Sequence, residues 1–140
     1  MIKKNVVGIL IKNKKILLQL RDNKSDIIFP NSWGFFGGEV NTNEDHNKAI
    51  KRELYEELNI KKFKTLKFIN SHFNSKYKCI FFIYTLKIDG NVNLKEGYDC
   101  DYFFLNKILK GKKSKKNGIF YKAAEVALMK KIFFLTNRFL

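Results

Sequence analysis

The chain has 140 residues, of which 45% are hydrophobic and 15% aromatic. This composition excludes a disordered chain and fits one globular domain over residues 1–140. The two cysteines, Cys79 and Cys100, have no metal-ligand spacing, so we expect buried free thiols in a reducing cytoplasm. The apolar runs near residues 6–11 and 132–135 are too short to cross a membrane, so we expect no membrane contact.

The net charge is +15, from 28 Lys and Arg against 13 Asp and Glu. A charge of this size attracts polyanions, which leaves nucleic acid open as a partner. The chain is also rich in Asn, Ile and Phe and has one proline, a bias that an A/T-rich genome would produce. The densest basic run, KGKKSKK at residues 110–116, is typical of a loop. Composition alone therefore leaves a functional charge and a genomic bias as alternatives.

The first half of the chain predicts three strands before a helix. Residues 5–12 and 16–21 are apolar and β-branched, and a polar turn at 13–15 joins them. Residues 21–31 lack apolar periodicity and contain the chain's proline, which predicts a loop. Residues 33–36 predict a strand that leads into a loop at Gly37-Gly38, where paired glycines would let the backbone approach a ligand closely.

Residues 45–58 predict a helix, with Asp45 as its N-cap. Ile50, Leu54 and Leu58 recur at four-residue steps and form an apolar stripe that would face the core. The sequence therefore places one helix, with a defined buried side, directly after the paired glycines.

Three glutamates, Glu53, Glu56 and Glu57, share a face of this helix beside the apolar stripe. Like charges at this spacing cost about 0.2–0.5 kcal/mol per pair, and the helix dipole disfavours anions in the last turn. Converging carboxylates suit a hard divalent cation that is shared with substrate phosphates. The alternative is a solvated charged face, which is common on helices.

The stretch from residue 38 to residue 60 resembles the Nudix box, G-x5-E-x7-R-E-U-x-E-E-x-G-U, in which U is aliphatic. Asn59 stands where the family has glycine, and asparagine is the next residue best able to adopt a left-handed backbone. The resemblance implies an α/β (α+β) fold in which helices sandwich a mixed β-sheet. The matching residues are Gly38, Glu44, Arg52, Glu53, Leu54, Glu56, Glu57 and Ile60.

The resemblance also implies an activity: metal-dependent hydrolysis of a nucleoside diphosphate linked to another moiety, with Mg²⁺ or Mn²⁺ as cofactor. Water would attack a phosphorus of the diphosphate. Arg52 would orient the acids by salt bridges, Glu44 would fix the loop before the helix, and Gly37 would lie against the substrate. The implied metal ligands are the carboxylates of Glu53, Glu56 and Glu57 and the carbonyl of Gly38.

Two further site residues are expected outside the box. Many Nudix proteins carry an arginine near the phosphates where Arg21 stands, although Arg21 could equally be an ordinary surface cation. Many also carry an acid between late strands that serves as general base or further metal ligand. Glu96 is the candidate here, with Asp99 and Asp101 as lesser ones, and a solvated loop acid is the alternative.

The second half of the chain predicts a hairpin and a closing helix. Residues 63–73 and 77–88 are the two strands, the second buried and central, with a turn at 74–76. Residues 101–105 form a short strand. Residues 121–136 predict a helix that packs on the sheet, with a homodimer interface as a further use of its aromatic surface. His46 and His72 are expected at the surface.

Three functions fit this sequence. The first is a pyrophosphohydrolase for a small nucleotide: a nucleotide sugar, an ADP-ribose-like molecule or a nucleoside triphosphate. The second is an RNA 5′-end pyrophosphohydrolase, to which only the basic charge points. The third is a non-catalytic nucleotide sensor, which would be expected to have lost carboxylates that this chain keeps.

Overall fold

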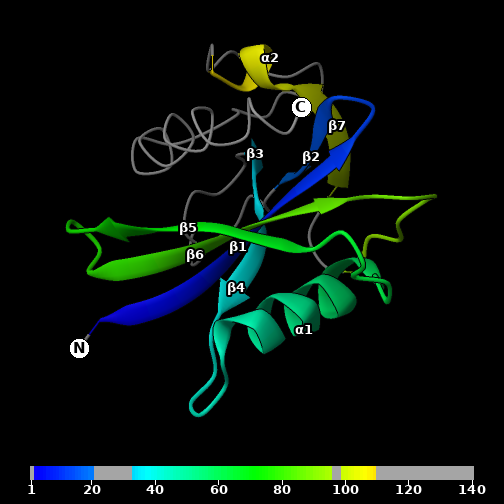
Figure 1. The fold of residues 1–140 in the computed structure, drawn as a ribbon. Helices are drawn as coiled ribbons and strands as arrows, with labels where there is room; N and C mark the ends of the chain where they lie inside the picture. Colours follow the sequence, from blue (N-terminus) through cyan, green and yellow to red (C-terminus); the bar gives the residue numbers. More distant parts are fainter. Residues whose placement is uncertain (1, 21–32, 96–98, 110–140) are drawn as a thin grey trace. The chain divides into compact units, whose positions relative to one another are not determined.

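The computed structural model describes residues 2–20, 33–95 and 99–109 (Figure 1). These residues belong to two compact units, which are described separately. The first unit comprises residues 1–10 and 35–96, and the second comprises residues 11–34 and 97–140. A single domain over the whole chain stays a prediction.

The first unit combines four strands and one helix. Strand β1 pairs antiparallel with β4 and has β6 as its other neighbour, and β6 pairs antiparallel with β5. The elements are β1 (Lys3–Lys12), β4 (Phe36–Glu39), α1 (His46–Leu58), β5 (Lys67–Asn74) and β6 (Cys79–Lys87).

Helix α1 packs on β1 through the apolar stripe that the sequence predicts. Ile50, Leu54 and Leu58 are at most 1% exposed. The contact is close because Gly8 of β1 has no side chain: a Cβ there would meet methyl groups of Ile50 and Leu54 at 3.4 Å. Burying a side chain of this size stabilises a fold by about 1.5–3 kcal/mol. The buried stripe therefore sets the rotation of the helix about its axis, and with it the direction in which the glutamates point.

The hairpin differs in detail from its prediction. Strand β5 begins at Lys67, and the turn occupies residues 75–78, where Lys78 has a left-handed φ of 49°. In β6, Cys79 and residues 83–86 are buried, whereas residues 80–82 are half-exposed. The two histidines predicted at the surface, His46 and His72, are half-buried. Hydrophobicity along the strand did not distinguish these half-exposed residues from the buried ones.

The second unit is built on β2 (Lys15–Leu20), which pairs antiparallel with β3 (Trp33–Gly34) and with β7 (Asp99–Phe104). Trp33 is fully buried and meets Phe103 edge to face, with ring centroids 4.8 Å apart. Asn13 and Lys14 both have positive φ, as expected of a tight hairpin turn.

Some features of the second unit were not predicted or are not described. A short helix, α2 (Leu105–Leu109), follows β7 without a sequence signal that predicted it. The predicted helix at 121–136 and the basic run at 110–116 lie outside the described residues. Of the two cysteines, which are both free thiols, Cys79 is buried as predicted and Cys100 is half-buried. In the part of the chain that the structure describes, no helix is long and apolar enough to span a membrane.

Candidate active site

The ends of α1 are capped as the sequence predicts. The Asp45 side chain accepts a hydrogen bond of 2.8 Å from the backbone N–H of Lys48 at the start of the helix. At the other end Asn59 adopts the left-handed conformation, with φ 58° and ψ 29°, and its N–H donates to the Tyr55 carbonyl at 2.9 Å. Asparagine thus occupies the backbone conformation that glycine is most often chosen for at a helix end.

The paired glycines lie in strand β4, which corrects the prediction of a loop at Gly37-Gly38. Gly37 is opposite Val7, and Gly38 is opposite Val6. Gly37 has φ +146°, and a Cβ there would collide with the Val6 carbonyl. A Cβ on Gly38 would collide with the carboxylate of Glu53. Pairing with β1 explains why the glycines are extended, and their missing side chains let α1 bring a carboxylate against the strand.

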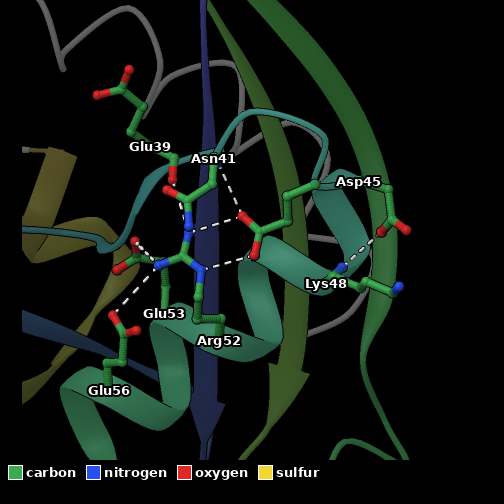
Figure 2. A network of polar contacts seen from close by, with 8 residues as sticks. Glu39, Asn41, Asp45, Lys48, Arg52, Glu53 and Glu56 are labelled. Atoms are coloured by element: carbon green, nitrogen blue, oxygen red, sulfur yellow. Dashed lines mark hydrogen bonds and ion pairs between the residues drawn. The ribbon is translucent and has the colours of Figure 1, made fainter.

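Arg52 is the centre of a network of polar contacts (Figure 2). Its Nε and Nη2 donate to the two carboxylate oxygens of Glu44 at 2.8 and 3.0 Å, in a bidentate pair. Its Nη1 donates to Glu53 at 2.9 Å and to Glu56 at 3.4 Å. Its Nη2 also donates to the backbone carbonyl of Glu39 at 3.0 Å. One guanidinium therefore connects the helix, strand β4 and the loop between them.

The Glu44 carboxylate is ionised over the whole physiological range. The hydrogen bond from Arg52, followed by that from the backbone N–H of Asn41, lowers the pKa of Glu44 to about 2. In turn, the hydrogen bond to Glu44 raises the pKa of Arg52 above its ordinary value. Both groups keep their charges near neutral pH, so the loop before α1 stays attached to the helix.

Glu57 is 5% exposed and crosses from α1 to β4. Its Oε1 accepts a hydrogen bond of 3.0 Å from the backbone N–H of Gly37. The backbone carbonyl of Glu57 accepts from the N–H of Lys95 at 2.8 Å, and that of Leu58 accepts from the N–H of Asn93 at 3.3 Å. These bonds satisfy carbonyls that a helix end leaves without partners. They also attach the segment at residues 93–95 to the end of α1.

The acids of α1 fit a divalent cation by charge and by donor type. Glu53 and Glu56 both bind the same nitrogen of Arg52, so their oxygens can reach a common ion. Carboxylate oxygens are the ligands that Mg²⁺ and Mn²⁺ prefer. As they stand, no three acidic, His or Cys side chains among the described residues form a metal-binding group, because Arg52 and Gly37 hold the carboxylates. The metal roles of Gly38, Glu53, Glu56 and Glu57 stay predictions.

The other predicted site residues are Arg21, Glu96, Asp99 and Asp101. Arg21 and Glu96 lie outside the described residues. Asp99 and Asp101 lie on β7, and each accepts a hydrogen bond from the next backbone N–H, at 2.7 and 2.8 Å respectively. The sequence analysis missed the carbonyl of Glu39 and the N–H of Asn41, because backbone partners leave no residue-type signal.

Comparison with known proteins identifies the family. The NUDIX domain model matches residues 2–123, so the chain belongs to the Nudix family. The chain is 36% identical over 103 residues to the 8-oxo-dGTP diphosphatase of Buchnera aphidicola, an alignment that spans 72% of this chain and 76% of the relative. Membership of this family and the similarity to this relative identify the chain as an enzyme, a pyrophosphohydrolase that acts on nucleotide pyrophosphates.

Solved structures confirm the predicted fold class, an α+β fold with a mixed sheet. The Escherichia coli ORF135 protein is similar with a TM-score of 0.70 and 23% identity, over 98% of this chain and 92% of its own. The DR0079 protein of Deinococcus radiodurans is similar with a TM-score of 0.76 and 20% identity, over 92% of this chain and 82% of its own. Nudix hydrolases generally use divalent metal ions and small nucleotide substrates.

Proposed function

We propose that this enzyme hydrolyses a nucleoside triphosphate to the monophosphate and diphosphate, with 8-oxo-dGTP as the first candidate substrate. The observation that carries the proposal is the 36% identity to a relative named for that activity, over nearly three quarters of the chain. One water molecule is consumed: its oxygen bonds to phosphorus, the P–O bond to the leaving diphosphate breaks, and the proton passes to a base.

We assign the divalent cation, Mg²⁺ or Mn²⁺, to the acids of α1 and the carbonyl of Gly38. The bound ion would neutralise phosphate charge and lower the pKa of an attacking water. The chain's own part is to place the acids: Arg52 holds Glu53 and Glu56 on one side of α1, and Gly37 holds Glu57. Because Glu44 takes two of the guanidinium's bonds, Arg52 is fixed before substrate arrives.

Nucleotide sugars, ADP-ribose-like molecules and 5′-triphosphorylated RNA remain as alternative substrates, since all share the pyrophosphate linkage. A sensor without activity is the other alternative. The complete set of carboxylates supports an enzyme, because a protein that only binds nucleotide does not need three acids around one guanidinium.

The test is hydrolysis by the purified protein, followed by chromatography of the products. The substrates are 8-oxo-dGTP, dGTP, a nucleotide sugar, ADP-ribose and 5′-triphosphorylated RNA, each with Mg²⁺, Mn²⁺ or EDTA. Glu57→Gln is compared with Asp89→Asn, which makes the same chemical change at an exposed position after β6. Metal-dependent cleavage of 8-oxo-dGTP that Glu57→Gln abolishes supports the proposal. If another substrate is cleaved preferentially, that substrate replaces 8-oxo-dGTP in the proposal. Tight nucleotide binding without turnover of any substrate would instead identify the protein as a nucleotide sensor.

A further inference from the structure

The charge of the first unit is divided between two regions. Residues 61–88, which contain the β5–β6 hairpin, carry seven lysines and no aspartate or glutamate, whereas residues 39–57 carry six acids. All seven lysine side chains are exposed. A concentration of one charge sign produces a local field that attracts the opposite charge. The seven residues are Lys61, Lys62, Lys64, Lys67, Lys76, Lys78 and Lys87.

Aromatic rings are exposed on the same hairpin. Phe68 is 49% exposed and Phe73 is 50% exposed. Residues five apart in a regular strand point to opposite faces, but the register shifts between Phe68 and Asn70. As a result Phe68 lies opposite Tyr84 and Phe73 lies opposite Ile80, two residues on one face of β6. The irregularity therefore brings both rings onto the same face of the hairpin.

Contacts with α1 and with β1 hold this face of the hairpin in place. The ring of His46, at the start of α1, stacks on Phe82 at 4.2 Å with an interplanar angle of 4°, and it shares a hydrogen bond with the Tyr84 hydroxyl. At the turn, the Lys78 carbonyl accepts a hydrogen bond of 3.0 Å from the N–H of Lys3 in β1. The hairpin is long and lies beside β1 in the sheet (Figure 1), and these contacts hold it in place before any partner binds.

We propose that this face of the β5–β6 hairpin binds single-stranded polynucleotide. The turn lysines Lys76 and Lys78 would contact the phosphates, and the rings of Phe68 and Phe73 would stack on bases, a combination that binds single strands with little sequence preference. Lys67 is opposite Thr85, so it lies on the other face of the hairpin and is not part of this surface. At about 3.3 Å per residue, the nine-residue strand β6 is about 30 Å long, which is enough for several nucleotides.

A polynucleotide fits the hairpin better than an anionic membrane does. Membrane binding by apolar side chains requires them to enter the bilayer by about 5–10 Å. Phe68 and Phe73 each expose about half of their surface, and Phe68 also packs against His46 with ring centroids 5.3 Å apart, so this face offers ring surfaces for stacking more than a wedge for insertion. The absence of acids from residues 61–88 suits any partner that carries phosphates, so the choice of a polynucleotide over a membrane rests on the rings.

The first test is fluorescence anisotropy of the full chain with a labelled 20-nucleotide oligothymidylate and a labelled oligouridylate, over a salt series. Lys76→Glu/Lys78→Glu is compared with Lys14→Glu/Lys107→Glu, which changes the net charge equally at exposed sites outside the hairpin. Lys14 and Lys78 also match in backbone, because both have positive φ. We expect the hairpin variant to weaken binding by at least about tenfold and to lower the salt slope by about 1.4, from two lost phosphate contacts. The control should change binding by less than about threefold.

The second test separates stacking from charge. Phe73→Ala is compared with Phe104→Ala, since Phe104 on β7 is 46% exposed and also belongs to a strand. Loss of one stacked base predicts about fivefold weaker binding for Phe73→Ala and no change for Phe104→Ala. Circular dichroism melts verify that all variants are folded.

Several results would overturn the proposal. No anisotropy change at low salt would do so, and so would equal weakening by both lysine pairs, since that would show a diffuse effect of composition. Sedimentation with phosphatidylserine-containing vesicles without oligonucleotide binding would assign the face to a membrane. A difference between the two oligonucleotides would tell DNA from RNA within the proposal. None of these outcomes depends on which nucleotide the active site hydrolyses.

Discussion

The acidic site on α1 and the basic hairpin β5–β6 belong to the same compact unit but are built differently. In the acidic site each charge has specific partners: Arg52 binds Glu44, Glu53 and Glu56, and Gly37 binds Glu57. On the hairpin the lysines are exposed and share one sign. Specific partners fix geometry, which catalysis needs, whereas a uniform field attracts a ligand without defining its orientation. The two regions therefore differ mainly in how their charges are connected to partners, and less in how many charges each contains.

The largest expected effect is at Glu57. Glu57→Gln keeps the size of the side chain but removes a charge from the proposed cation site, so we expect kcat/KM to fall by about a thousandfold. Asp89→Asn should stay within about twofold of the unchanged enzyme. Steady-state hydrolysis assays measure both. Equal activity of the two variants would mean that the charge of Glu57 takes no part in hydrolysis.

A smaller loss is expected at Arg52, which acts through the acids. Arg52→Lys keeps the charge but loses the bidentate bond to Glu44, and we expect kcat/KM to fall by about 10- to 100-fold. A double-mutant cycle with Glu44→Gln should show a coupling energy of about 0.5–3 kcal/mol in the activation free energy. Additive effects at Arg52 and Glu44 would remove the distinction between the two regions.

The two glycines of β4 should respond differently to alanine. In Gly37→Ala the Cβ meets the backbone of Val6 at a positive φ, so we expect a loss of about 1–3 kcal/mol in the free energy of unfolding. In Gly38→Ala the Cβ meets the end of the Glu53 side chain, which can move, so activity should fall more than stability. Urea denaturation and hydrolysis assays separate the two effects. Gly90→Ala, in open space at φ +87°, is the control for backbone strain alone.

The pH dependence of stability tests the pair of Glu44 and Arg52. The pKa of Glu44 is lowered from 4.5 to about 2 in the folded state, so this carboxylate stabilises the fold fully above pH 4.5 and loses that effect as pH falls towards 2. The stability difference between the unchanged protein and Glu44→Gln should therefore be constant near neutral pH and shrink below pH 4.5. Urea denaturation at several pH values measures it. A difference that does not shrink would show that Glu44 acts without its charge.

The smallest effect is expected at the end of α1. Asn59→Ala should destabilise the fold by about 1 kcal/mol, because alanine tolerates the left-handed conformation less well than asparagine. Asn59→Gly should change stability by only a few tenths of a kcal/mol and leave activity unchanged. Thermal melts measure both. A large loss of activity in Asn59→Gly would mean that the asparagine side chain has a role that its backbone position does not explain.

The sequence by itself determined the helix, its caps, its buried stripe and the acids beside that stripe. These features are local: a 3.6-residue period, an N-cap and an αL-tolerant residue depend on neighbours within about one turn. The family resemblance rested on the same short stretch. For that reason Ile50, Leu54, Asp45 and Asn59 have the structural roles that were predicted for them.

Only the tertiary structure decided which atoms those residues contact. The glycines predicted to form a loop became part of a strand because β1 pairs with them, and Glu39 and Asn41 entered the site through backbone atoms that have no sequence signature. On the hairpin, a single irregularity of register moved Phe68 and Phe73 onto one face. Strand register and backbone partners depend on residues far away in the chain, so a pattern of residue types along the sequence does not determine them.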